Sequence, residues 1–439
     1  MSIPREPGLI RRGVFWLLLL GPLFFLTYGL ANSFTAQRDD VGSLVFAWER
    51  QIPLWPWTIV PYWSIDLLYG LSFLVPRTRG EMDRHGLRLL SAQLICVAGF
   101  LLWPLRFTFE RPELSGLFGW LFDVLMGFDK PYNQAPSLHI TLLVVIWAMF
   151  ARHTQGRLLR GLLHVWMVLI GLSVLTTWQH HFIDLPTGAM AGFFCVWLWP
   201  REGRPPLFAA SLPQGPQRYR LAWRYALGAA LFAGMAFGFK GGWLWLLWPA
   251  LALLLVALNY LLFGADGFQK RADGSQSCAV RWLLAPYLAA ARINSRLWTR
   301  RHPQPDEICD GVWLGRVPAK GEADRFAAIV DLCAELPVKV APGQHYRSLP
   351  CLDLVPPDPA LCREAATAIE TLRNNGPVLV CCALGYSRSA SAVAAWLVTS
   401  GRCADVDAAE SLIRSARPGI VLHPAHRQVL QQLHAGACP

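Results

Sequence analysis

The first part of the chain is dominated by apolar runs, each about as long as a bilayer is thick. A helix needs about 20 mostly apolar residues to cross a membrane, so these runs predict about eight transmembrane helices. They are placed at residues 13–31, 55–75, 87–105, 135–151, 161–177, 183–200, 222–239 and 242–263. The apolar segment 114–128 forms either a loop or a re-entrant or interfacial helix. The pattern therefore predicts a polytopic helical membrane domain over residues 1–263.

Towards the C-terminus the apolar runs become short. Residues 377–380 are typical of a buried strand, and residues 390–398 are typical of a helix. The loop between them contains Cys382, Gly385 and Arg388. A strand, a loop and the N-terminus of a helix, in this order, form a frequent setting for phosphate binding.

The composition supports a membrane protein, because 54% of the residues are hydrophobic, only 16% are charged and 20 are Trp. The formal net charge of +11 comes largely from arginines in alternate connections between the expected spans. By the positive-inside rule these connections and both termini lie in the cytoplasm. We expect an integral protein of a bacterial inner membrane and, without a basic patch interleaved with aromatic residues, no nucleic-acid partner.

The cysteines follow the same division. Cys96 and Cys195 fall in expected spans, and the other nine of the 11 follow the last span. This distribution fits a thiol enzyme in the reducing cytosol. No pair of C-x-x-C motifs has the spacing of a zinc site, so no metal and no cofactor are expected.

The loop from Cys382 combines a thiol nucleophile with groups that bind phosphate. Backbone N–H groups up to Arg388 form a concave nest at a helix N-terminus, which attracts anions and favours the thiolate form of Cys382. Arg388 adds a planar two-pronged donor. Ser389 can hydrogen-bond the thiolate and ease its departure, and Gly385 and Ser389 are the expected phosphate-binding residues of the loop.

These residues resemble the dual-specificity branch of the cysteine-dependent protein tyrosine phosphatases, whose signature is H-C-x-x-G-x-x-R-S. The resemblance covers about residues 305 to 434 and includes the strand-like segments 311–316 and 328–332. It implies an α/β domain over residues 305–439, with a central sheet flanked by helices. One position departs from the signature, because Cys381 replaces the histidine before the nucleophile.

The reaction of this family also needs a general acid. Asp353 lies upstream of the loop by a distance similar to that of the family's acid, and we favour it over Asp358, whose surroundings resemble a helix N-cap. The resemblance implies attack of Cys382 on phosphorus, formation of a cysteinyl-phosphate, and hydrolysis of that intermediate.

Residues 264–304 form an expected linker between the two domains. Its arginines fall on one side of a helix and its apolar residues on the other, so it either lies on anionic lipid or packs as a capping helix on the phosphatase domain. Both arrangements keep the cytosolic site close to the bilayer.

Three polar clusters interrupt the apolar runs, and they face the same, outer side in the expected topology. They contain Arg111, then Ser137 and His139, then His180 and Asp184. Four residues separate His180 from Asp184, so on a helix the carboxylate can orient the imidazole for attack on phosphorus. His139 can protonate the leaving alkoxide, while Arg111 and Ser137 hold phosphoryl oxygens.

The three clusters resemble the type 2 phosphatidic acid phosphatase superfamily, with its motifs K-x6-R-P, P-S-x-H and S-R-x5-H-x3-D. The match covers about residues 90 to 200, but Pro104 and Val174 replace a lysine and an arginine. Loss of two cations favours a diester over a monoester substrate. The paired histidines also resemble the inositol phosphorylceramide synthase and sphingomyelin synthase branch, in which a lipid alcohol accepts the phosphorylated head group.

Together these features predict a bifunctional membrane enzyme of phospholipid metabolism. A histidine-based phosphatase or phosphotransferase would act outside, and a cysteine-based phosphomonoester phosphatase inside. The expected partners are a phospholipid or another phosphorylated membrane substrate, with a phosphoprotein as a further possibility. The alternatives are a membrane-tethered tyrosine phosphatase and a catalytically weak protein that binds a phosphorylated partner.

Overall fold

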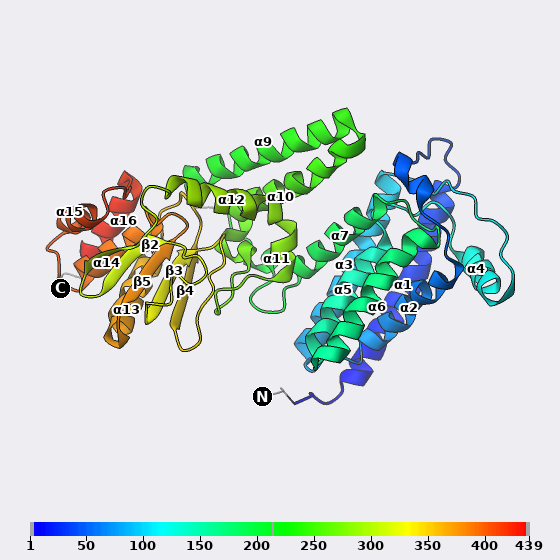
Figure 1. Ribbon diagram of the computed structural model, residues 1–439, viewed down its shortest axis with the longest axis horizontal. Coiled ribbons are helices and arrows are strands. Elements are labelled where there is room, and N and C mark those ends of the chain that lie inside the picture. The colour runs from blue at the N-terminus through cyan, green and yellow to red at the C-terminus, as the bar shows by residue number, and fades with distance from the viewer. Residues whose placement is uncertain (1–3, 213–214, 436–439) are drawn as a thin grey trace. The chain divides into compact units, whose positions relative to one another are not determined.

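The computed structural model describes residues 4–212 and 215–435. The chain divides into two compact units, of which the first ends at Arg201 and the second begins at Glu202. The first unit is helical, and the second combines helices with a five-stranded sheet (Figure 1).

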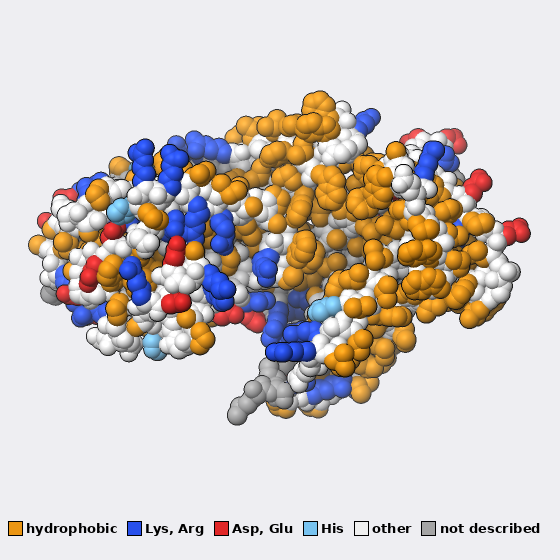
Figure 2. Space-filling model, viewed as in Figure 1, with side chains coloured by type: hydrophobic (Ala, Val, Ile, Leu, Met, Phe, Trp, Pro, Cys, Tyr) orange, Lys and Arg blue, Asp and Glu red, His pale blue; other side chains and the backbone are white. Residues whose placement is uncertain are grey.

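The first unit is built from apolar helices. Its α-helices are α1 (Leu9–Thr35), α2 (Ile59–Ser72), α3 (Arg79–Leu102), α4 (Gly116–Phe128), α5 (Leu138–His153), α6 (Arg157–Thr176) and α7 (Asp184–Leu198). Two 3-10 helices, η1 (Ala47–Gln51) and η2 (Pro56–Thr58), precede α2. Hydrophobic side chains cover most of the visible surface of this unit, as helices that face lipid require (Figure 2).

Within the described residues, five helical segments are long and apolar enough to cross a membrane. They are Leu9–Thr35, Arg79–Leu102, Arg157–Thr176, Pro216–Phe239 and Gly241–Phe268. The other three expected spans correspond to α2, α5 and α7, which are shorter, with 14, 16 and 15 residues. The segment expected as a loop or a re-entrant or interfacial helix forms α4. The N-terminal region is therefore a set of several apolar helices.

Helices α5 and α7 approach each other closely because α7 presents glycines at the contact. A Cβ atom on Gly188 would lie 2.6 Å from the carbonyl oxygen of Ser137, and one on Gly192 would lie 2.9 Å from that of Thr141. The Thr141 hydroxyl also donates to the carbonyl of Gly188 at 3.0 Å. This packing brings the start of α7 next to the start of α5.

The second unit begins with helices and continues into the sheet domain. Its helices before the sheet are α8 (Pro206–Ala209), α9 (Pro216–Phe239), the 3-10 helix η3 (Gly241–Leu246), α10 (Leu247–Leu258), the π-helix η4 (Asn259–Phe263), the 3-10 helix η5 (Gly264–Phe268), α11 (Cys278–Leu283) and α12 (Ala285–Trp298). The helices that follow are α13 (Pro359–Leu372), the 3-10 helix η6 (Arg373–Asn375), α14 (Arg388–Thr399), α15 (Val406–Ala416) and α16 (Pro424–Ala435).

The sheet has the strand order β1-β2-β5-β3-β4. Its strands are β1 (Asp306–Cys309), β2 (Val312–Arg316), β3 (Ala328–Cys333), β4 (His345–Cys351) and β5 (Val378–Cys382). Strand β1 pairs antiparallel with β2, and the other pairs are parallel, so the sheet is mixed. The sequence-based predictions of strands at 311–316, 328–332 and 377–380 and of a helix at 390–398 are confirmed.

Strand β5 shows the two-residue alternation of a buried strand. Val378, Val380 and Cys382 point into the core shared with α13, α14, α15 and α16. Leu379 and Cys381 point to the opposite face of the sheet, into a smaller core. Because neighbouring residues face opposite sides, Cys382 faces α14 and Cys381 faces away from it.

Residues 264–304 fold as part of the second unit. The ammonium group of Lys270 is buried and donates to Asp331, on strand β3. On α12, the hydroxyl of Ser295 donates to the carbonyl oxygen of Ala383 at 2.6 Å, directly after the nucleophile of the expected phosphatase loop. The segment therefore packs on the sheet domain. Of the two arrangements expected from the sequence, a helix on anionic lipid and a capping helix, this is the capping helix.

Candidate active sites

In the second unit, the candidate nucleophile Cys382 ends strand β5, and its side chain is buried. The backbone N–H of Gly385 donates to its sulfur at 3.3 Å, and the Ser389 hydroxyl donates at 3.1 Å. The loop needs glycine at position 385, because φ is +74° there and a Cβ atom would lie 2.3 Å from the carbonyl carbon of Gly315. Helix α14 begins directly after this loop, at Arg388, so its positive end faces the sulfur.

Arg388 is buried beneath the loop and is held by oxygen atoms. Its guanidinium donates to both carboxylate oxygens of Glu335, at 2.9 and 2.6 Å, and to the carbonyl of Cys351 at 2.9 Å. Burial of Glu335 would raise its pKa, but the ion pair with Arg388 outweighs this effect and lowers the pKa below its ordinary value. Glu335 therefore stays ionised and fixes the guanidinium for a phosphate oxygen.

Asp353 lies in the loop after strand β4, and one of its carboxylate oxygens is 3.0 Å from the guanidinium of Arg388. Burial raises the pKa of Asp353 above its ordinary value, although Arg388 opposes the shift. A carboxyl group that keeps its proton to higher pH is suited to act as a general acid. The competing candidate, Asp358, instead caps α13 and accepts from the N–H of Leu361 at 2.8 Å.

Cys381, which replaces the histidine of the family signature, is fully buried on the face away from the nucleophile. Burial raises its pKa well above the ordinary value, and the charge of Asp331 raises it further. Asp331 itself is bonded to Lys270 and accepts from the hydroxyl of Tyr346 at 2.8 Å. This buried network braces the strand behind the nucleophile.

Three polar groups around the loop were not predicted from the sequence. Glu335 follows β3, and only the parallel pairing of β3 with β5 brings it to Arg388. The guanidinium of Arg417 is also buried and donates to the carbonyl of Gly385 at 3.0 Å. His426 lies 3.0 Å from the hydroxyl of Ser387. An acidic residue at the carboxyl end of a buried strand was the available signal for Glu335.

In the first unit, the structure brings together Ser137, His180 and Asp184. Nδ1 of His180 lies 3.1 Å from the carboxylate of Asp184, and Nε2 lies 3.1 Å from the hydroxyl of Ser137. All three side chains are buried. The carboxylate contact at Nδ1 favours the tautomer with a lone pair on Nε2, which is the nitrogen that faces Ser137.

Arg111 and His139 lie near this group without contacting His180. Arg111 donates to the carbonyl of Trp178 at 3.2 Å, two residues before His180. His139 stacks on the ring of Tyr62, with ring centroids 4.2 Å apart. Nε of Arg111 and Nε2 of His139 are buried without a hydrogen-bond partner. Unpaired buried donors and acceptors are costly, so both groups can receive a polar ligand.

His181 has a different role from its neighbour His180. Its Nδ1 lies 3.1 Å from the carboxylate of Glu49, and its Nε2 accepts from the backbone N–H of Thr108 at 3.2 Å. The ring also stacks on Phe107, with centroids 4.5 Å apart. Its Nε2 lone pair is taken up by a backbone N–H, whereas Nε2 of His180 meets only the hydroxyl of Ser137, so His180 stays the candidate nucleophile. Glu49 was missed by the sequence analysis because it is remote in the chain.

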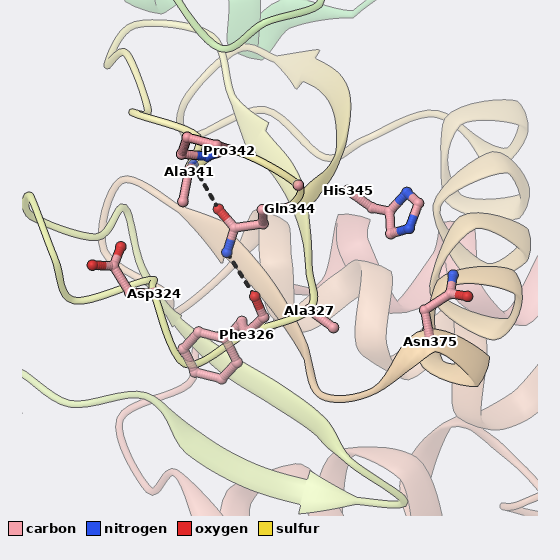
Figure 3. Close-up of a pocket in the computed structure, with 9 residues that line it drawn as sticks. Asp324, Phe326, Ala327, Ala341, Pro342, Gln344, His345 and Asn375 are labelled. Atoms are coloured by element: carbon pink, nitrogen blue, oxygen red, sulfur yellow. Dashed lines mark hydrogen bonds between the residues drawn. The ribbon is translucent and has the colours of Figure 1, made fainter.

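A separate pocket of about 300 Å³ lies where strands β3 and β4 begin (Figure 3). The catalytic loop follows the other end of the parallel strands, so this pocket does not contact Cys382. The Gln344 side chain in the pocket wall is already bonded, to the carbonyl oxygens of Ala323 and Phe326 and to the N–H of Ala341. Among the described residues, no group of three or more His, Cys, Asp or Glu is placed to hold a metal ion.

Comparison with known proteins supports the assignment of the second unit. Residues 318–435 match the family described as "Dual specificity phosphatase, catalytic domain". This segment is a dual-specificity phosphatase domain. This domain is accordingly that of a phosphoric monoester hydrolase. No curated protein matches the chain.

Several solved phosphatase structures are similar to part of the chain. Human DUSP28 is 24% identical, and the match covers 30% of this chain and 96% of that chain, with a TM-score of 0.28. PTPMT1 is 23% identical, with coverages of 30% and 95% and a TM-score of 0.28. Tk-PTP in the active form is 28% identical, with coverages of 30% and 98% and a TM-score of 0.28.

Proposed function

We propose that this protein is a bifunctional membrane phosphatase of phospholipid metabolism. In this proposal the cysteine site acts on the cytosolic face, where it hydrolyses phosphate monoesters of lipid head groups. A histidine site in the first unit acts on the outer face as a lipid phosphatase or phosphotransferase. The chain would cross the membrane about eight times, with α2, α5 and α7 as short spans and both termini in the cytoplasm.

At the cysteine site, the thiolate of Cys382 attacks phosphorus and displaces the head-group oxygen. Arg388 and the N–H groups of the loop stabilise the charge of the transferring phosphoryl group. Asp353 donates its proton to the departing oxygen. A water molecule then attacks the cysteinyl-phosphate and gives its proton to the Asp353 carboxylate. Inorganic phosphate leaves, and the thiolate is restored.

The observation that supports the second site is the chain of contacts from Asp184 through His180 to Ser137. In the proposed reaction Nε2 of His180 attacks phosphorus, and the carboxylate of Asp184 stabilises the positive charge that forms on the ring. His139 donates a proton to the leaving alkoxide, and Arg111 holds a phosphoryl oxygen. Water or a lipid alcohol then takes the phosphoryl group from His180.

The substrate of the cysteine site is tested with the full-length protein in vesicles. We expect phosphate release from a vesicle-embedded lipid monoester, such as phosphatidic acid, to exceed release from a soluble phosphotyrosine peptide at equal concentration. The Cys382→Ser variant gives the background for both substrates. Equal or faster release from the peptide would contradict the proposed lipid role and would support a membrane-tethered tyrosine phosphatase.

The histidine site is tested by trapping its intermediate. With a phosphate-labelled lipid and rapid quenching, the protein is expected to carry label that is stable in alkali and lost in acid, as phosphohistidine is. Cys382→Ser is the background for this experiment, so that cysteinyl-phosphate does not contribute. His180→Ala should remove the label, while the control His164→Ala should retain it. Label that persists in His180→Ala would exclude His180 as the nucleophile.

A further inference from the structure

The loop that carries Asp353 is bonded to two apolar helical segments of the second unit, α9 and Gly241–Phe268. We call these two segments the helical hairpin. The hydroxyl of Tyr260 donates to the backbone carbonyl of Asp353 at 2.9 Å. The side-chain amide of Gln217, in the first turn of α9, donates to the carbonyl of the next residue, Leu354. Two consecutive carbonyls of the loop are therefore held by the hairpin.

Tyr260 is itself fixed from several directions. Its side chain is buried, and its ring stacks on Tyr225 of α9 with centroids 5.4 Å apart. Tyr225 in turn meets the edge of Tyr287, on α12, at 5.9 Å. Nε of Arg218 donates to the backbone carbonyl of Tyr260 at 2.9 Å. Tyr260 also lies in the π-helical turn η4, an irregularity that is frequent at functional sites.

The loop needs such support because its own conformation is unfavourable. Leu354 has a φ of +57°, in the left-handed region that a leucine rarely adopts. Residues held there typically cost about 1–3 kcal/mol, and they persist only where surrounding contacts determine the backbone. Strand β4 has ended at Cys351 and α13 starts at Pro359, so regular secondary structure does not hold the residues between them.

We propose that Tyr260, assisted by Gln217, positions Asp353, the general acid of the cysteine phosphatase. The helical hairpin would then be needed for the full activity of this site. This inference rests on the proposed role of Asp353. Without the bond from Tyr260 the Asp353 carboxyl would sample positions away from the leaving oxygen. Tyr260 touches no reacting atom and acts only through the loop.

Misplacement of Asp353 should affect substrates to different degrees, depending on their leaving group. An alkyl phosphate needs proton donation, because an alkoxide is a strong base, whereas p-nitrophenolate leaves readily without a proton. A misplaced Asp353 therefore slows the cleavage of alkyl phosphates and has little effect on p-nitrophenyl phosphate. A general loss of folding or of phosphate binding would slow both substrates alike.

The test measures kcat/KM of the full-length protein in detergent for glycerol 3-phosphate and for p-nitrophenyl phosphate, after subtraction of the Cys382→Ser background. Tyr260→Phe, which removes only the hydroxyl, is expected to lower the value for glycerol 3-phosphate about tenfold, which corresponds to the loss of one hydrogen bond. The value for p-nitrophenyl phosphate should change less than about twofold. The control is Tyr219→Phe, an exposed tyrosine on α9, and it should change neither value.

Further variants separate failure of this inference from failure of the assignment of Asp353. Asp353→Asn should lower glycerol 3-phosphate turnover about 10²-fold or more, and adding Tyr260→Phe to it should cause no further loss. Gln217→Ala should repeat the selectivity of Tyr260→Phe. If Asp353→Asn shows no leaving-group selectivity, Asp353 is not the acid. The inference is wrong if Asp353→Asn slows glycerol 3-phosphate selectively but Tyr260→Phe and Gln217→Ala do not. Those two variants would then slow both substrates equally or slow neither.

Discussion

In the C-terminal domain the groups around the nucleophile come largely from one loop, whereas in the helical unit they come from several distant segments. Cys382 ends β5, Gly385 lies in the following loop and Ser389 lies in the first turn of α14, so their geometry follows from local backbone structure. In the first unit, Ser137 and His180 meet only because α5 and α7 pack closely. A local site can be recognised from sequence spacing, but a distributed site depends on helix packing.

The two arginines sharpen the contrast. The guanidinium of Arg388 is paired with Glu335 and with Asp353 before any phosphate is present. Nε is buried without a hydrogen-bond partner in both arginines, but the other guanidinium nitrogens of Arg111 donate to the sulfur of Met126 and the carbonyl of Trp178 instead of to carboxylates. The cysteine site is thus preorganised by ionic contacts within the protein. Both sites keep a buried guanidinium nitrogen that a ligand can satisfy, and the histidine site adds Nε2 of His139.

The largest effect is expected for Asp184→Asn. The amide can donate to Nδ1 of His180 and so favour the wrong tautomer, in which Nε2 carries the proton. We expect the lipid turnover of the first unit to fall about 10³-fold to 10⁴-fold, as when the carboxylate of a catalytic triad is replaced by an amide. Turnover of p-nitrophenyl phosphate by the cysteine site should not change. A loss of less than about tenfold would contradict the proposed role of the Asp184–His180 pair.

The next effect concerns pH at the cysteine site. Because burial raises the pKa of Asp353, the acid keeps its proton to higher pH than a free aspartic acid. The rate with glycerol 3-phosphate should therefore fall as the pH rises through this pKa. The amide of Asp353→Asn neither donates a proton to the leaving oxygen nor titrates. The rate of this variant should therefore be about 10²-fold lower at the optimum and should lack this fall. A profile of unchanged shape in Asp353→Asn would assign the ionisation to another group.

Helix packing is tested by Gly188→Ala. The added Cβ atom meets the carbonyl oxygen of Ser137 at 2.6 Å, so α7 must move away from α5 and take Asp184, its first residue and the partner of His180, with it. We expect about a tenfold loss of lipid turnover. The control Gly161→Ala raises helix propensity in the same way but meets no atom within 4 Å, so it should have no effect. Equal activity of the two variants would mean that the close approach is not needed.

The smallest effect is expected for Ser389→Ala. The hydroxyl bond to the sulfur of Cys382 stabilises the thiolate that leaves when the cysteinyl-phosphate is hydrolysed. We expect kcat to fall about fivefold, with an initial burst of p-nitrophenol as the intermediate accumulates. Stopped-flow absorbance measures the burst. A slower turnover without a burst would place the effect before the formation of the intermediate.

The sequence was sufficient to predict the phosphatase fold and its loop, because their signals are local. The strand before Cys382, the helix after Arg388 and the capping role of Asp358 all follow from neighbouring residues. Glu335 could not be predicted in the same way. Its contact with Arg388 arises from the parallel pairing of β3 and β5, a tertiary feature that spacing does not encode.

The apolar segments were harder to interpret. Hydropathy identified the regions of α2, α5 and α7, but these helices are shorter than the expected spans. Tyr260 was treated only as part of an apolar span, because no local pattern relates it to a loop more than 90 residues later. Glu49 was missed for the same reason, since its contact with His181 spans 132 residues.

The central claim is that one chain contains two chemically independent phosphoryl-transfer sites. It is tested most directly by following lipid-phosphate turnover and p-nitrophenyl phosphate hydrolysis in the same preparations of full-length His180→Ala and Cys382→Ser. We expect His180→Ala to lose the turnover that remains in Cys382→Ser and to keep the hydrolysis of p-nitrophenyl phosphate. We expect Cys382→Ser to show the reverse. Loss of all lipid turnover in Cys382→Ser, with none lost in His180→Ala, would contradict the account.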